Sequence, residues 1–300
     1  MSVLVNVNGR ISDGASAAIS IFDHGFLYGE GVYETIRTYN GEPFLFDRHM
    51  QRLRTSAEMI RLDVPLSDRD YLQRSLDTMT AAGLGRKSNG AVADAYIRIL
   101  HTRGIGDLTY DPAATPTPSV VVIVKPFPVT PEEQFATGVK VCLVDIIRNH
   151  PRSVNPLIKS NNLLNNALCM QEAMRKGGVE GVFRNFKGEL SECSQSNLFI
   201  VRDGVVLTPP LDAGLLAGIT RAFVFELGAA HGIRVEEATL RDADLFDADE
   251  AFFTGTTKEL MPIVQVDDRT IGSGVPGPVT RKLLEEFRRV AHEMTTAVAR

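Results

Sequence analysis

The sequence is poor in cysteine, and its cysteines form no recognisable disulfide or metal-binding pattern. Three are present, Cys142, Cys169 and Cys193, at wide spacing and without a CxxC pair or a histidine cluster nearby. An odd number at such spacing argues against a disulfide framework and against a zinc site. We therefore expect three buried thiols in a protein of the reducing cytoplasm.

Long apolar runs and concentrated basic charge are also lacking. The longest purely aliphatic run covers residues 120–124, which is far too short to cross a bilayer. The N-terminus has no basic segment followed by an apolar stretch, so no export signal is expected. The net charge is −5 and the basic residues are scattered, whereas a polyanion requires a concentrated basic surface. Neither a membrane nor a nucleic acid is expected as a partner.

The chain contains neither GxGxxG nor GxxxxGK[ST], so the usual dinucleotide and ATP signatures are missing. What it does contain is a proline-rich segment, with three prolines within residues 125–131. Proline fixes the backbone and removes hydrogen-bond donors, which suits a linker. We predict a small N-terminal α/β domain at residues 1–125, a linker at 126–132 and a large C-terminal domain at 133–300.

Apolar periodicity predicts a mixture of strands and helices without regular alternation, which indicates the α+β class. Asp47 is expected to cap a helix whose apolar positions recur from Met50 to Ile60. Ser160, Asn161 or Asn162 is expected to cap a helix over residues 163–176. Further strands are expected at residues 3–7, 32–39, 92–100, 119–124, 139–146 and 250–254, a hairpin-like run at 181–207, and helices at 68–82, 220–230 and from about 279.

Lys159 is one of only eight lysines and lies just before a predicted helix, in a segment with flanking apolar residues such as Ile158 and Leu163. The positive end of a helix and apolar surroundings both favour a free amine over an ammonium group. A lysine must be deprotonated to attack an aldehyde. Taken alone, however, a lysine is more often a solvated surface charge.

Two segments can bind an anion such as phosphate. Residues 218–221 (GITR) open a predicted helix, where unpaired backbone N–H groups and the Thr220 hydroxyl become available. Residues 254–257 (TGTT) end an apolar strand with hydroxyl groups and a flexible glycine. Each segment is equally compatible with an ordinary capped turn.

Polar residues alternate with apolar residues on two predicted strands of the N-terminal domain. On one strand, Tyr96 and Arg98 share a face opposite alanine and isoleucine side chains. On the other, Tyr33, Thr35 and Arg37 share a face. Tyrosine and arginine together can bind a substrate carboxylate, although a solvent-facing strand surface shows the same alternation.

These motifs, in this order, resemble the fold-type-IV (class IV) pyridoxal 5'-phosphate (PLP) enzymes. That family contains branched-chain aminotransferases, D-amino-acid aminotransferases and aminodeoxychorismate lyases. The resemblance runs from residue 23 to residue 281 and rests on residues 23–37 (DHGFLYGEGVYETIR), 158–164 (IKSNNLL), 192–199 (ECSQSNLF), 218–221 (GITR), 255–257 (GTT) and 277–281 (GPVTR).

The resemblance implies a two-lobed α+β fold and a homodimer, or a higher homo-oligomer, with active sites between the lobes. It implies that Lys159 holds PLP as a Schiff base and shuttles the substrate proton, and that Glu192 pairs with the pyridine nitrogen. The residues implied to bind the phosphate are Arg52, Ile219, Thr220 and Thr256, and those implied to line the substrate pocket are Tyr28, Tyr33, Arg37, Tyr96, Arg98 and Thr257. The implied reaction moves an amino group between amino acids and 2-oxo acids.

The substrate preference is left open by mixed signals. Tyr96 and Arg98 resemble the branched-chain aminotransferases, in which this arginine helps to receive the side-chain carboxylate of 2-oxoglutarate. Leu163 stands where those enzymes usually have a tyrosine and D-amino-acid aminotransferases tend to have leucine, and Gln195 stands where they usually have glycine. We favour a branched-chain L-amino-acid aminotransferase, with a D-amino-acid aminotransferase as the alternative. A lyase or a catalytically silent PLP-binding protein is less favoured.

Overall fold

The computed structural model describes residues 3–87 and 90–298, and the chain divides into two compact units. Unit 1 takes its residues from Met1–Pro128, Ile158–Asn162 and Ala291–Arg300, and unit 2 takes its residues from Val129–Leu157 and Leu163–Val290. The chain thus leaves unit 1 inside the proline-rich segment. The predicted division placed Lys159 in the C-terminal domain, whereas the structure includes it in unit 1. The pairing of its backbone with a strand of unit 1, described below, explains this difference.

In the described part of unit 1, six antiparallel strands form one sheet in the order β2-β1-β8-β7-β3-β4. A short hairpin connects β3 to β4, and its residues Asn40 and Gly41 have φ values of 54° and 80°. Such values suit a tight hairpin turn and favour asparagine and glycine. The strands are β1 (Leu4–Val7), β2 (Arg10–Asp13), β3 (Gly31–Tyr39), β4 (Glu42–Pro43), β7 (Ala95–Thr102) and β8 (Ser119–Pro126), with a separate pair β5 (Gly85–Arg86) and β6 (Val92–Ala93).

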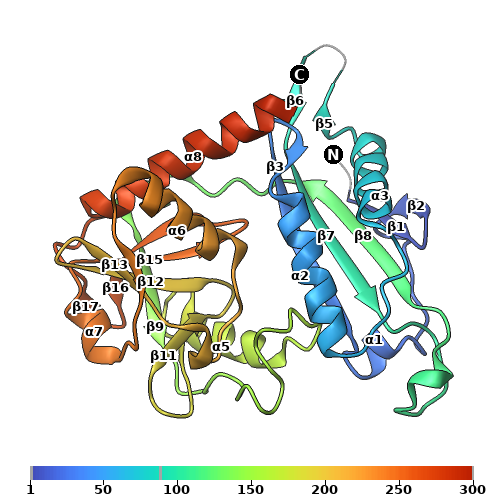
Figure 1. Ribbon diagram of the computed structural model, residues 1–300, viewed down its shortest axis with the longest axis horizontal. Coiled ribbons are helices and arrows are strands. Elements are labelled where there is room, and N and C mark those ends of the chain that lie inside the picture. The colour runs from blue at the N-terminus through green and yellow to red at the C-terminus, as the bar shows by residue number, and fades with distance from the viewer. Residues whose placement is uncertain (1–2, 88–89, 299–300) are drawn as a thin grey trace. The chain divides into compact units, whose positions relative to one another are not determined.

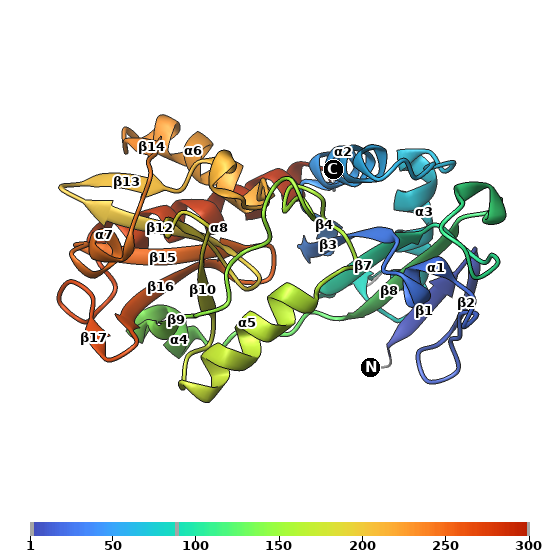
Figure 2. The same cartoon turned by 90° about the horizontal axis from the view of Figure 1, so that it is seen from below.

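Helices α2 (Phe46–Met59) and α3 (Asp68–Ala81) lie on the same side of this sheet (Figure 2). Helix α2 packs against β3, while α3 packs against β8 and β1. The apolar core between helices and sheet includes Ile36, Met50, Leu53, Ile97 and Val122. A short helix α1 (His24–Leu27) and a 3-10 turn (Pro112–Ala114) complete the helical structure described for this unit, together with the end of α8 (Pro278–Val298).

The predicted cap of α2 is wrong. Leu45, in the left-handed conformation with φ 53°, occupies the N-cap position, and no side chain caps the helix there. The chain enters the helix from the β3–β4 hairpin, so the helix begins one residue before Asp47. Asp47 lies instead in the first turn, where its charge favours the positive end of the helix.

Unit 2 contains a larger mixed sheet. Its order is β11-β10-β9-β16-β15-β12-β13-β14, with β17 paired to β16, and three neighbouring pairs are parallel: β9–β10, β9–β16 and β13–β14. The strands are β9 (Val139–Leu143), β10 (Gly181–Arg184), β11 (Leu190–Cys193), β12 (Asn197–Arg202), β13 (Val205–Thr208), β14 (Val235–Glu237), β15 (Glu250–Gly255), β16 (Glu259–Val266) and β17 (Arg269–Thr270). The predicted α+β class is confirmed.

Helices of unit 2 pack on this sheet (Figure 1). Helix α5 (Leu164–Arg175) contacts β9 and β10, α6 (Ile219–His231) contacts β14 and β15, and α4 (Glu132–Thr137) contacts β16. Phe223 of α6 meets Phe287 of α8 with ring centroids 5.7 Å apart. Helix α7 (Asp242–Phe246) and a 3-10 turn (Leu211–Ala213) lie in the connections.

The predicted caps of α5 are also wrong. Leu163 occupies the N-cap position without a side-chain hydrogen bond. Ser160 and Asn161 pair with β3 instead: Ser160 forms a β-bridge with Val32, and the Asn161 N–H donates to the Gly31 carbonyl at 2.9 Å. Because their backbones are held there, neither residue takes the cap position.

None of the helices in residues 3–87 and 90–298 combines the length and apolar character that a membrane span requires.

Candidate active site

One face of the unit 1 sheet carries Tyr33, Thr35 and Arg37 of β3 together with Tyr96 and Arg98 of β7. In the antiparallel register, Arg37 lies opposite Tyr96 and Thr35 lies opposite Arg98. These residues and Tyr33 are half-buried, whereas the alternating positions of the other face, such as Ile36 and Ile97, are fully buried. The predicted alternation is therefore confirmed, and it gathers hydroxyl and guanidinium groups on one surface.

Lys159 is attached to this sheet at the free edge of β3. Its carbonyl accepts a hydrogen bond from the Tyr33 N–H at 2.9 Å, and its own N–H donates to the Ser56 Oγ at 3.1 Å. The Lys159 Nζ lies 4.5 Å from the centroid of the Tyr33 ring, and the Arg98 Cζ lies 4.0 Å from the same centroid. One aromatic ring therefore lies beside both the lysine amine and a guanidinium group.

The opposite face of β3 carries a buried charged group. Arg52 donates to both carboxylate oxygens of Glu34, each at 2.7 Å, and the His49 Nδ1 is 2.7 Å from the Glu34 Oε2. Burial opposes the negative charge, but Arg52 and His49 outweigh it and lower the pKa of Glu34 to about 2. Burial lowers the pKa of His49, while the neighbouring Glu34 opposes this shift. Because the ionised carboxylate can only accept, the Nδ1–H of His49 is the donor in this hydrogen bond. Arg52 is thereby held in a defined orientation.

One face of α2 organises this half of the site. His49, Arg52 and Ser56 are spaced three and four residues apart, so their side chains project from the same side of the helix. Two of them bind Glu34, and the third binds the backbone of Lys159. The sequence analysis missed Glu34 and His49. A signal for Glu34 was present in the sequence: the alternation of β3 assigns this glutamate to the buried face of the strand, where a charged residue needs a partner.

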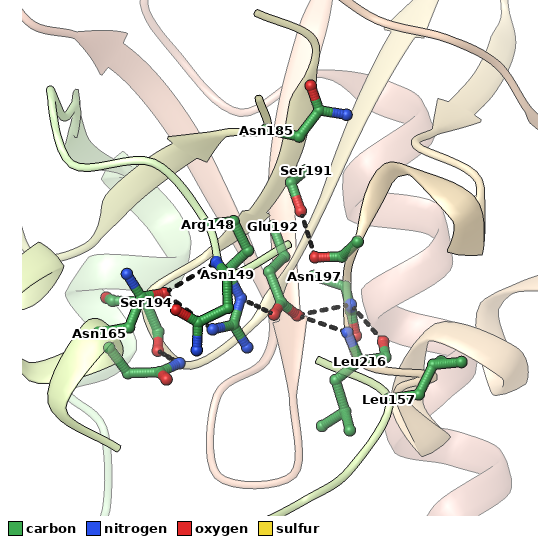
Figure 3. Close-up of polar contacts among 12 residues, drawn as sticks. Arg148, Asn149, Leu157, Asn165, Asn185, Ser191, Glu192, Ser194, Asn197 and Leu216 are labelled. Atoms are coloured by element: carbon green, nitrogen blue, oxygen red, sulfur yellow. Dashed lines mark hydrogen bonds and ion pairs between the residues drawn. The ribbon is translucent and has the colours of Figure 1, made fainter. Parts of the chain in front are cut away.

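In unit 2, Glu192 lies in a network of hydrogen bonds (Figure 3). Its Oε1 accepts from the Arg148 Nε at 2.8 Å, and its Oε2 accepts from the Leu216 N–H at 3.0 Å. The Asn197 Nδ2 is 3.5 Å from the same Oε2 and donates to the Leu216 carbonyl at 2.9 Å. Glu192 is therefore a buried carboxylate with fixed orientation, and not a surface charge at the start of a strand.

Asn197 connects this carboxylate to the start of α6. A Cβ atom on Gly218 would lie only 1.9 Å from the Asn197 Oδ1, so the close approach requires glycine. Gly218 is the N-cap residue of α6, and no side chain caps the helix. The first N–H groups of α6, at Ile219 and Thr220, are thus suited to binding an anion.

Thr256 and Thr257 lie in the turn between β15, which neighbours β12, and β16. Thr254 pairs with Asn197 in the β12–β15 register, and the Lys258 N–H donates to the Gly255 carbonyl at 3.0 Å to close the turn. Both threonines are half-buried. Glu192, the start of α6 and this threonine turn therefore belong to one connected part of unit 2.

Each unit, taken by itself, presents its own set of polar groups. Unit 1 contains a lysine amine, Arg52 and a face of tyrosine and arginine residues, and unit 2 contains a buried carboxylate, Glu192, beside an uncapped helix start. The Tyr28 ring packs on the rings of His24 and Tyr110, with centroids 4.9 Å apart in each pair. The three cysteines are buried and free, and in residues 3–87 and 90–298 no group of three potential ligands could hold a metal ion.

The model of the class IV aminotransferase family matches residues 31–266. The chain belongs to this family and is a transaminase. The family uses PLP, and the expected cofactor is thereby confirmed.

Known relatives carry two different names. A Methanocaldococcus jannaschii protein assigned as a branched-chain-amino-acid aminotransferase is 37% identical over 95% of this chain and 96% of its own length. The D-alanine aminotransferase of Bacillus licheniformis is 34% identical over 92% of this chain and 93% of its own. Among solved structures, the branched-chain amino acid aminotransferase of Escherichia coli superposes with a TM-score of 0.90 at 30% identity, covering 98% of this chain and 96% of that one.

Proposed function

We propose that this transaminase moves the amino group of branched-chain L-amino acids to 2-oxoglutarate, with PLP held covalently by Lys159. The observation that carries the proposal is that the Lys159 amine and the Arg98 guanidinium lie beside the same Tyr33 ring. A carboxylate bound by Arg98 would bring its substrate close to the amine. Relatives and solved structures named as branched-chain aminotransferases support the choice of substrate.

In this proposal PLP, when bound, would supply an aldehyde carbon and an electron-withdrawing ring. Glu192 would accept a hydrogen bond from the ring nitrogen, and the phosphate would be bound by Arg52, Ile219, Thr220 and Thr256. Lys159 takes the substrate proton and returns it. The residues proposed to line the substrate pocket are Tyr28, Tyr33, Arg37, Tyr96, Arg98 and Thr257.

D-Amino acids are the alternative substrates. Leu163 and Gln195 depart from the usual pattern of the branched-chain enzymes, and D-alanine aminotransferases are among the relatives. The test is a panel of L- and D-amino acids offered to the purified enzyme with 2-oxoglutarate as acceptor. Turnover of L-valine, L-leucine and L-isoleucine well above that of D-alanine supports the proposal, and the reverse order overturns it. A silent PLP-binding protein would stay yellow with every donor.

We also propose that two copies of the chain associate through an apolar surface of unit 1. Two segments, 20–28 and 104–110, lie side by side, because Asp23 forms a β-bridge with Ile105 and the Gly106 N–H donates to the Phe22 carbonyl at 3.2 Å. Between them they expose Ile21, Phe22, Phe26, Ile105, Leu108 and Tyr110, with Tyr110 79% exposed. Such a patch is typical of a protein interface. Sedimentation of the wild type and of Leu108→Lys tests this: a dimer that the substitution weakens supports the surface.

A cytoplasmic location is proposed on the basis of the cysteines. All three are free thiols buried in unit 2, as is usual for proteins of a reducing compartment.

A further inference from the structure

We propose that Arg148 is a positioning residue for Glu192, fixing its carboxylate and balancing its charge so that one acceptor position is left for the ring nitrogen of PLP. The inference rests on the role proposed above for Glu192. It adds a residue that the sequence motifs did not single out.

Arg148 is itself held by several elements. Its backbone N–H donates to the carbonyl of Arg184, the last residue of β10, at 2.9 Å. Its side-chain Nη1 donates to the Oδ1 of Asn165 on α5, also at 2.9 Å. Its Cζ lies 5.3 Å from the centroid of the Phe183 ring. The guanidinium group is therefore fixed before any cofactor binds, as Figure 3 shows for its contacts with Asn165 and Glu192.

The Arg148–Glu192 pair is almost completely removed from solvent. The side chains are 8% and 6% exposed, and the Nε and Oε1 atoms are 2.8 Å apart. A buried carboxylate is costly unless an opposite charge and hydrogen bonds compensate it. Removal of Arg148 alone would leave the charge of Glu192 buried without a cation, and breaking a buried ion pair in this way is strongly destabilising.

The hydrogen bonds of Glu192 leave room for one more donor. An ionised carboxylate has about four acceptor positions. Three are used by Arg148, Leu216 and Asn197. A protonated ring nitrogen is a donor that can take the remaining position, and the three bonds already made fix its direction.

Charge balance gives the pair a second effect. The guanidinium group of Arg148 compensates the buried negative charge of Glu192. The carboxylate therefore stays in its place and does not turn toward another donor or toward solvent. A neutral side chain at position 148 would lose both effects.

The test is a double-mutant cycle with Arg148→Met and Glu192→Gln. Each apoenzyme is titrated with PLP, and the single-turnover reaction with an amino donor is followed separately. In the wild-type background, Arg148→Met should weaken PLP binding and slow the single turnover by about 10- to 100-fold, with a much smaller change in the KM for the donor. In the Glu192→Gln background, Arg148→Met should change neither quantity by more than about threefold, because position 192 no longer has a carboxylate for the guanidinium group to position.

Controls separate the possible failures. Arg148→Lys keeps a cation near the carboxylate and should recover most of the PLP affinity. Arg202→Met removes an arginine from a half-exposed pair with Asp244, whose side chains are 36% and 31% exposed, and should leave PLP binding unchanged. Equal effects of Arg148→Met in both backgrounds would make Arg148 merely structural and overturn this inference alone. No effect of Glu192→Gln on PLP binding would overturn the proposed role of Glu192 and this inference with it.

Discussion

Tyr33 donates its backbone N–H to the carbonyl of Lys159 at 2.9 Å, and the ring of the same tyrosine lies 4.5 Å from the Lys159 Nζ. The lysine is thus held to β3 through both its backbone and its side chain. The position of its amine follows from the position of this strand, and so does the position of Arg98, which β7 places against the same ring.

Lys159→Ala should abolish transamination while leaving the protein folded. The variant loses both the covalent attachment of PLP and the group that moves the substrate proton, a function that contributes on the order of 10²–10⁴-fold. Turnover is measured with an L-amino acid and 2-oxoglutarate, and the fold by circular dichroism. Lys140→Ala is the control, since Lys140 pairs with the fully exposed Asp268. Appreciable turnover by Lys159→Ala would remove this lysine from its proposed role.

Arg98→Ala should raise the KM for 2-oxoglutarate more than the KM for pyruvate. Only 2-oxoglutarate has a second carboxylate, and a lost charge-assisted hydrogen bond costs about 1.5–3 kcal/mol, or roughly 10- to 100-fold. Steady-state kinetics with both acceptors measures the difference. Arg54→Ala, which breaks an exposed pair with Asp68, should change neither value. Equal increases for the two acceptors would mean that Arg98 does not recognise the second carboxylate.

Glu34 should stabilise the fold above about pH 4.5 and lose this effect in acid. Its pKa is lowered from 4.5 to about 2 in the folded protein, so the unfolded chain binds a proton first as the pH falls. A shift of this size corresponds to about 3 kcal/mol. The free energy of unfolding, measured by urea titration, should therefore fall more steeply between pH 4.5 and 2 for the wild type than for Glu34→Gln. Parallel curves would contradict the buried ion pair with Arg52.

Glu180 should make the free energy of unfolding fall as the pH rises, which is the opposite of the pH dependence expected for Glu34. Burial raises its pKa from 4.5 to about 7 despite hydrogen bonds from Ser194 and the Gln195 N–H. Between these two pH values the unfolded chain releases a proton that the folded protein retains, so stability falls as the pH rises, by up to about 3 kcal/mol. Glu180→Gln keeps an acceptor for Ser194 and should flatten this decline. A decline of unchanged slope in the variant would show that another group causes it.

The sequence alone determined the elements and the faces of the strands, because both depend on neighbours close along the chain. Alternation on β3 and β7 predicted which side chains share a face, and the register confirms it for Tyr33, Arg37 and Arg98. The ordered motifs also predicted the family. The local sequence pattern did not predict the N-cap residues of α2 and α5, which are Leu45 and Leu163 and not the expected polar residues. The path of the chain before each helix determines where the helix begins.

Tertiary structure alone decided which partners the charged groups have. The pairs Arg148–Glu192 and Arg52–Glu34 join residues 44 and 18 positions apart, and no local spacing predicts such pairs. The inclusion of Lys159 in unit 1 is of the same kind, since it depends on a backbone pairing with β3. A buried charge requires a partner, but the fold determines which residue is close enough to be that partner.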